Sequence, residues 1–128
     1  MTASLFWKLG SLFGTTAIVT GSYGSHGLKT RLEKQENAER LRQSWMTGAH
    51  MHLTHSLALL LTSLKLHLIP QTASLLPGYL FAAGITLFSG SIYLLVLDKH
   101  KKYSKILGPI TPIGGLCLMA GWASLALL

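Results

Sequence analysis

Four apolar stretches constrain this chain most, because each is long enough to cross a bilayer. They cover residues 5–23, 45–68, 76–97 and 106–128 and take up most of the 128 residues. A helix needs about 20 apolar residues to cross a hydrocarbon core about 30 Å thick. The sequence therefore predicts an all-α integral membrane protein, a single domain formed by a four-transmembrane-helix bundle with short loops.

The composition agrees with this prediction and argues against other classes. Only 12% of the residues are charged, against about a quarter in a typical soluble domain. Four spans leave no room for a catalytic domain outside the membrane. The net charge of +7 comes from cations that flank apolar stretches without interleaved aromatic residues, so we expect anionic lipid headgroups as partners rather than nucleic acid. No basic residue precedes Leu5, so we expect the first stretch to be a retained helix rather than a cleaved signal peptide.

The basic residues predict the orientation in the membrane. Nine of the eleven Lys and Arg residues lie in the connectors 25–44 and 98–105, and none lies in the connector between the second and third stretches. The positive-inside rule places the two basic connectors in the cytoplasm, or in the matrix of a mitochondrion, with both termini on the outer side. The cations expected to contact lipid headgroups, cardiolipin or another anionic lipid, are Lys29, Arg31, Arg40, Arg42, Lys99, Lys101, Lys102 and Lys105.

The connector 25–44 is the only long loop, and it has a weak apolar stripe beside its charges. Leu28, Leu32 and Leu41 belong to this stripe. Two interpretations fit it equally well: a short amphipathic helix lying on the inner headgroups, or a solvated helical extension of the second span.

Small residues at helical spacing predict where the helices approach one another, because helices in lipid associate through close packing. Such residues occur in the first, third and fourth stretches, and the second stretch shows no comparable face. The predicted packing positions are Gly10, Gly14, Gly21, Gly84, Gly90, Gly114, Gly115 and Gly121.

Histidine is the residue type here that most suggests chemistry. His26 follows the first stretch, and His52 and His55 are three residues apart near the start of the second. Imidazoles at one end of two adjacent helices could bind a metal, a haem or a quinone headgroup. Hydrogen bonding to backbone carbonyls explains them as well, and we favour that structural interpretation.

Other motifs are less informative. Pro109 and Pro112 stand close to the paired glycines Gly114 and Gly115, which we interpret as the first turn of a helix rather than as broken backbone lining a site. The four stretches contain no Asp or Glu, so a proton-coupled exporter is disfavoured. The single cysteine, Cys117, excludes a CxxC redox or zinc motif. No catalytic set can be assembled, so we expect no enzyme activity and no cofactor.

Four sequence blocks resemble a known family. They are Gly24-Ser25-His26-Gly27-Leu28-Lys29, similar to a GAHGL signature; residues 55–60; Gly84 with residues 87–93; and residues 108–115 followed by Gly121-Trp122. In order and spacing they resemble the domain-of-unknown-function-423, or transmembrane protein 256, family of small four-helix membrane proteins. The resemblance implies no established reaction. It implies that the polar or aromatic positions of the family's blocks are, in this sequence, His26, His55, Ser89, Tyr93, Thr111 and Trp122. The connector 29–44 is longer and more charged than in that family.

We therefore expect a non-enzymatic accessory or scaffold subunit that packs with other membrane protein subunits, most naturally within a respiratory-type complex of the mitochondrial inner membrane. The alternative is a membrane protein that binds a small ligand at the histidine-rich inner end of the first two helices. Its candidate binding residues are His26, His52, His55, Tyr93 and Thr111. A third interpretation is a small homo-oligomeric transporter.

Overall fold

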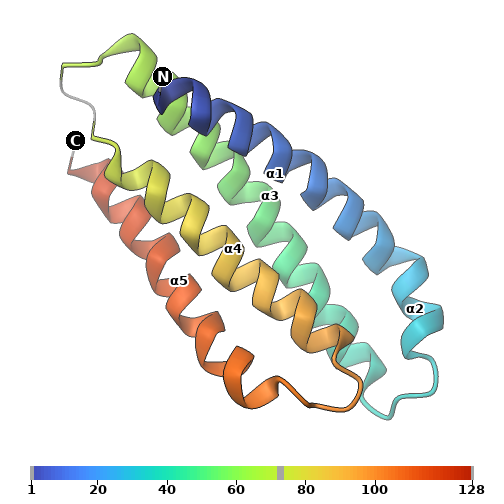
Figure 1. Ribbon diagram of the computed structural model, residues 1–128. Coiled ribbons are helices and arrows are strands. Elements are labelled where there is room, and N and C mark those ends of the chain that lie inside the picture. The colour runs from blue at the N-terminus through green and yellow to red at the C-terminus, as the bar shows by residue number, and fades with distance from the viewer. Residues whose placement is uncertain (1, 72–73, 128) are drawn as a thin grey trace.

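Helices form nearly all of the part of the chain that the computed structural model describes, residues 2–71 and 74–127. α1 spans Thr2–Ser25, α2 Gly27–Leu32, α3 Ala38–Leu68, α4 Leu76–Leu97 and α5 Ser104–Ala126. The four long helices lie side by side in the order α1, α3, α4, α5, each antiparallel to its neighbour (Figure 1). The all-α prediction is confirmed. The helices form an open row, in which α1 and α5 share no packed interface among the described residues.

The helix boundaries differ from the predicted apolar stretches mainly at their ends. α4 coincides with the stretch 76–97, whereas α3 begins at Ala38, about two turns before the predicted residue 45. α1 and α5 also begin earlier than predicted, at Thr2 and Ser104. The last predicted position, 128, lies outside the described residues. Apolar length measures the part of a helix that suits lipid, and polar turns can extend the helix beyond it.

The connector 25–44 combines features of both interpretations offered for it. It contains the short helix α2, and its last residues form the first turns of α3. However, Leu28 and Leu32 of α2 are buried, with 0% and 2% of their surface exposed, against Trp45 and Val96. The apolar stripe of α2 therefore covers the ends of the long helices and does not lie on lipid headgroups.

The position of the two prolines within α5 shows that one prediction was wrong. Pro109 and Pro112 were expected in the first turn of a helix, but α5 begins at Ser104 and runs through both of them. Each proline removes one backbone donor, and such losses are tolerated in membrane helices where neighbouring groups satisfy the freed carbonyls. Since no backbone break is present, this segment does not form the discontinuous helix that the other interpretation required.

The distribution of side chains between surface and interior suits lipid. All four long helices expose large apolar side chains, such as Ile18, Leu61, Leu94 and Met119, each more than half exposed. The buried polar residues are His52, His55, Ser56, Thr62, Ser63, Ser89 and Ser91. A soluble protein rarely exposes apolar side chains over such a large continuous surface.

Two helices of the described chain, α4 and α5, are by length and composition alone apolar enough to cross a membrane. α1 contains more hydroxyl residues than these two helices, and α3 contains four histidines as well as hydroxyl residues. Several of these hydroxyls bond to backbone carbonyls of their own helix, as Thr15 does to Ser11 and Thr62 to Ala58. Such bonds lower the cost of placing a hydroxyl in lipid.

Glycines allow the helices of each pair to approach closely. Gly10 of α1 lies against Leu60 of α3, and Gly14 and Gly21 face α3 more loosely. Between α4 and α5, the predicted positions Gly84, Gly114, Gly115 and Gly121 face Leu118, Phe88, Phe88 and Phe81, respectively. Gly90 differs, because a side chain there would meet no atom within 4 Å. The second stretch also has a close-packing glycine, contrary to the prediction: Gly48 lies against Ile92 and Tyr93.

Candidate functional site

His52 lies at the centre of a hydrogen-bond network that joins α1, α3 and α4. Its Nε2 atom is 3.3 Å from the Thr16 hydroxyl, and its Nδ1 atom is 3.1 Å from the Tyr93 hydroxyl. The Tyr93 hydroxyl is also 3.1 Å from that of Thr20 on α1. Trp45 extends the network by donating its indole N–H to the Thr20 carbonyl at 2.7 Å. Polar contacts thus join three helices around the buried His52, with Thr16 at the exposed edge of the network.

His55 makes the corresponding link from α3 to α5. Its Nδ1 atom lies 2.6 Å from the Met51 carbonyl, and its Nε2 atom lies 3.1 Å from the indole nitrogen of Trp122. Because an indole N–H can only donate and a carbonyl can only accept, the ring fits both contacts with its proton on Nδ1. Phe81 of α4 lies beside both rings, with ring centroids 5.9 Å and 5.4 Å away.

The structure does not bring the predicted ligand residues together. His26 lies between α1 and α2, ten residues and about 15 Å along the axis of α1 from Thr16, which contacts His52. Thr111 pairs instead with Ser91, with 2.6 Å between their hydroxyl oxygens. Of the predicted set, only His52 and Tyr93 are in direct contact. Since α3 starts at Ala38, His52 and His55 lie near its middle rather than at the inner end.

The chemistry open to these residues is limited by their contacts. Both nitrogens of His52 and both of His55 have protein partners. The Ser89 hydroxyl donates to the Gly48 carbonyl at 2.8 Å and does not face an imidazole. Within residues 2–71 and 74–127, His, Cys, Asp and Glu nowhere gather in a group of three that could hold a metal. The arrangement suits helix-to-helix hydrogen bonding.

Sequence reasoning missed three members of the His52 network, Thr16, Thr20 and Trp45. The two threonines are four residues apart and therefore lie on one face of α1. Hydroxyls at this spacing in an apolar helix are a usable signal, because they tend to bond across helices. The aromatic Trp45 stands where the apolar part of α3 begins, a position typical of membrane interfaces.

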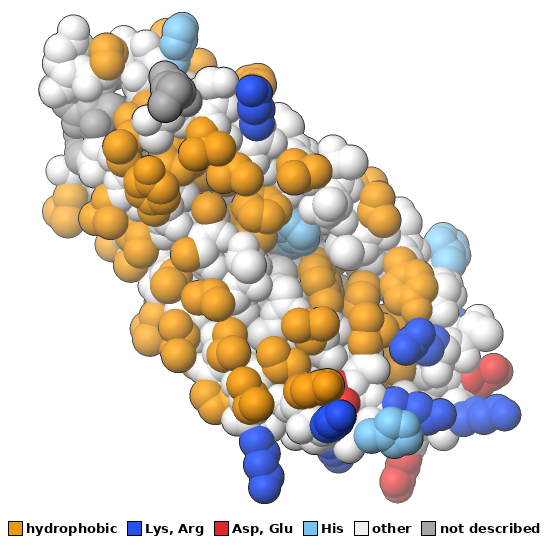
Figure 2. Space-filling view, in the orientation of Figure 1, with side chains coloured by type: hydrophobic (Ala, Val, Ile, Leu, Met, Phe, Trp, Pro, Cys, Tyr) orange, Lys and Arg blue, Asp and Glu red, His pale blue; other side chains and the backbone are white. Residues whose placement is uncertain are grey.

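The eight cations predicted to contact lipid all lie at one end of the molecule, which we call the basic end. They are on α2, the first turns of α3, the α4–α5 loop and the start of α5. Figure 2 shows Lys and Arg gathered at this end, below a surface rich in apolar side chains. We define the basic end as residues 25–44 and 98–105.

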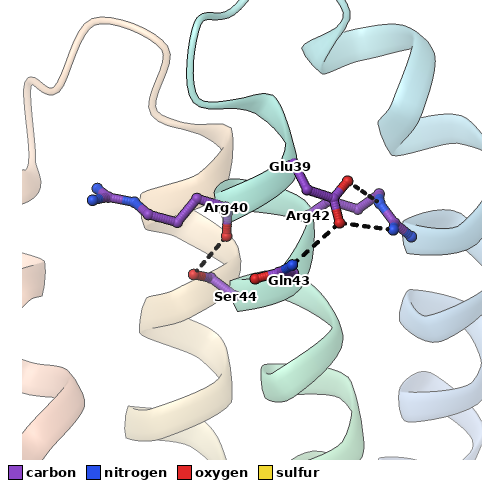
Figure 3. A network of polar contacts seen from close by, with 5 residues as sticks. All are labelled: Glu39, Arg40, Arg42, Gln43 and Ser44. Carbon is purple, nitrogen blue, oxygen red and sulfur yellow. Dashed lines mark hydrogen bonds and ion pairs between the residues drawn. The ribbon is translucent and has the colours of Figure 1, made fainter.

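One of these cations is engaged by a carboxylate. Arg42 donates from Nε and Nη2 to Glu39 at 3.1 Å and 3.0 Å, and Gln43 donates to the same carboxylate (Figure 3). The hydrogen bonds from Arg42 hold the pKa of the Glu39 carboxyl below its usual value. Because this is the one ion pair among the described residues, Arg42 is the least available of the eight cations for lipid.

Comparisons with known proteins agree with the resemblance seen in the sequence. A family model described as "Protein of unknown function (DUF423)" matches residues 20–115. A UPF0382 membrane protein of Schizosaccharomyces pombe is 40% identical over 93% of this chain and 96% of its own length. UPF0382 membrane proteins of Staphylococcus aureus and Bacillus subtilis are 37% and 33% identical, over 94% and 92% of this chain and 91% and 89% of their own.

No solved structure matches the chain. The family model covers the region from the end of α1 to Gly115 of α5, which includes His52, His55 and both parts of the basic end. Since the relatives also align over nearly their whole length, this chain belongs to the DUF423 family of membrane proteins.

Proposed function

We propose that this chain is a non-enzymatic membrane protein whose four long helices cross the bilayer and pack against other membrane proteins, as an accessory or scaffold subunit of a larger complex. The interior polar groups support this role, because they are used in contacts between the chain's own helices. Between the two ends, each long helix exposes large apolar side chains, and no Asp or Glu lies there. Interaction along the membrane plane is what such a surface suits.

One observation carries the proposal, an uncovered face of small residues on α4. Ala83 and Thr86 are exposed, and a side chain at Gly90 would meet nothing within 4 Å. These three residues are spaced by three and four positions, so they lie on one helix face. α3 and α5 already cover other faces of α4. In lipid, a small-residue face allows a further helix to approach closely.

The proposed compartment follows from the relatives and the charges. Relatives named as membrane proteins occur in both bacteria and a fission yeast. In a eukaryotic cell the mitochondrial inner membrane is the counterpart of a bacterial plasma membrane, and we propose that location there. The basic end then faces the matrix, or the cytoplasm in a bacterium, by the positive-inside rule.

The experiment is a native gel of membranes solubilised in mild detergent, with the co-migrating proteins identified by mass spectrometry. We expect the chain to migrate with a larger assembly. Gly90→Leu should reduce that co-migration several-fold, because the added side chain blocks close approach. Ala120→Leu is the control: it places the same leucine side chain at an exposed position of α5, outside the α4 face.

The outcomes separate the proposals. Migration of the natural chain as a monomer would overturn the subunit role. Migration as a small homo-oligomer, with no other protein present, would also overturn it and favour the transporter interpretation. Equal loss of co-migration in both variants would show that the α4 face is not the docking surface.

A further inference from the structure

A hollow of about 720 Å³ opens at the basic end, where α4 ends and α5 begins. Its wall is apolar and includes Leu94, Leu97 and Ile106, and its rim carries cations from two separate parts of the chain. Leu94 and Ile106 are 56% and 65% exposed, so they are left uncovered by the protein. The rim cations are Arg31 of α2 and Lys99 and Lys102 of the α4–α5 loop.

The loop that carries the lysines is fixed by hydrogen bonds. The Asp98 carboxylate accepts the backbone N–H of Tyr103 at 2.8 Å, and the Asp98 carbonyl accepts that of Lys101 at 3.1 Å. Lys101 has φ 52°, which completes the tight turn. Asp98 is the one acid among the residues that line the hollow, and its carboxylate is already used within the loop. The rim therefore presents three cations against one engaged carboxylate.

The position of the hollow matches the two parts of a phospholipid. α4 and α5 are the two helices most suited to hydrocarbon, and the hollow lies where their apolar residues give way to the basic loop. A lipid phosphate at the rim would face Arg31, Lys99 and Lys102, while its acyl chain would lie along Leu94, Leu97 and Ile106. We propose that this hollow is a binding site for one anionic phospholipid.

The same contacts argue against a zwitterionic lipid. A phosphatidylcholine has the same phosphate, but its quaternary ammonium would lie beside the cationic rim, whereas the common protein partner of choline is an aromatic face. The Tyr103 ring is taken by the chain itself, because the Lys102 ammonium lies over it, 5.4 Å from its centroid. The inference goes beyond the packing role and does not depend on any protein partner.

The test compares two double variants of the purified full chain by native mass spectrometry during titration with phosphatidylglycerol or phosphatidylcholine. Lys99→Gln with Lys102→Gln removes two rim cations. Lys101→Gln with Lys105→Gln removes the same charge from neighbouring residues that do not line the hollow. We expect the rim variant to lose about 30-fold in affinity for phosphatidylglycerol, roughly fivefold per cation, and the control variant to lose less than about threefold.

Several results would overturn the proposal. Equal losses in the two double variants would mean diffuse attraction between a basic surface and an anionic lipid. Equal affinity for phosphatidylcholine would remove the role of charge. Glycerol phosphate, which lacks acyl chains, should bind far more weakly than the lipid; equal binding would show that the rim takes a free phosphate. Ile106→Ser should weaken lipid binding and leave glycerol phosphate unaffected, which tests the apolar wall separately from the rim.

Discussion

His52 and His55 lie about one turn apart on α3, yet they bond to different helices. His52 contacts Thr16 of α1 and Tyr93 of α4, whereas His55 contacts Trp122 of α5. Sequence spacing identified both histidines as notable and placed them on roughly one face of the helix. It could not identify their partners, because helical spacing shows which side of α3 a residue faces but not which helix lies on that side. The role of each histidine became clear only when the order of the helices was known.

At this scale we predict that Trp122→Phe destabilises the fold by about 0.5–2 kcal/mol, within the range of interhelical hydrogen bonds in membranes. The substitution keeps an aromatic ring but removes the N–H that His55 accepts. The measurement is the unfolding transition in detergent. Trp7→Phe is the control, because Trp7 is 53% exposed and its indole makes no hydrogen bond to the described residues. Equal effects of the two changes would contradict the prediction.

A second measurement tests the hydrogen-bond geometry of His55 directly. The nitrogen chemical shifts of His55 in the natural chain should show a proton on Nδ1 and an unprotonated Nε2, as the Met51 and Trp122 contacts require. A proton found on Nε2 would mean that the indole contact does not form as described.

The helices show which boundaries sequence can predict. α4 coincides with its predicted stretch because polar residues stand at or near both of its ends. Ser74, two residues before α4, accepts the backbone N–H of Leu76, and Asp98 directly follows the helix. α3 was predicted too short, because its first turns are charged and Glu39 pairs with Arg42 along the helix. Such i,i+3 pairs favour a helix in water. The length of an apolar stretch does not take them into account. The prolines of α5 misled for a related reason, since local rules neglect the support from neighbouring helices.

At the element scale, two alanine substitutions distinguish a packed glycine from a free one. Gly114→Ala should destabilise the α4–α5 pair by about 1–2 kcal/mol, because the added methyl group would overlap the Phe88 backbone, which cannot rotate away. Gly90→Ala should be neutral or stabilise the fold by up to about 1 kcal/mol, because alanine favours the helix and the site is open. Both are measured by unfolding in detergent. Destabilisation by Gly90→Ala of the same size would contradict this assignment.

For the whole molecule, the sequence predicted which charged residues share one end, but it did not predict the order in which the helices pack. Charge alone placed the two basic connectors on one side, and the antiparallel row places their residues at one end. The order α1, α3, α4, α5 could not be predicted. Small residues occur at helical spacing on several helices, and this spacing does not show which helix packs against which. The hollow at the basic end was equally hidden, since Arg31 and Lys99 are far apart in the sequence.

The orientation in the membrane is the last prediction, and its test also asks whether α3 crosses the bilayer. In a chain with Cys117→Ser, a single cysteine is introduced either by Lys34→Cys in the basic end or by Gln71→Cys in the opposite α3–α4 turn; both positions are exposed. An impermeant maleimide added outside intact bacterial cells should label position 71 and not position 34. Inverted vesicles should reverse this pattern, because the positive-inside rule keeps the basic end in the cytoplasm. Labelling of both positions from one side would mean that α3, the helix between them, does not cross the bilayer.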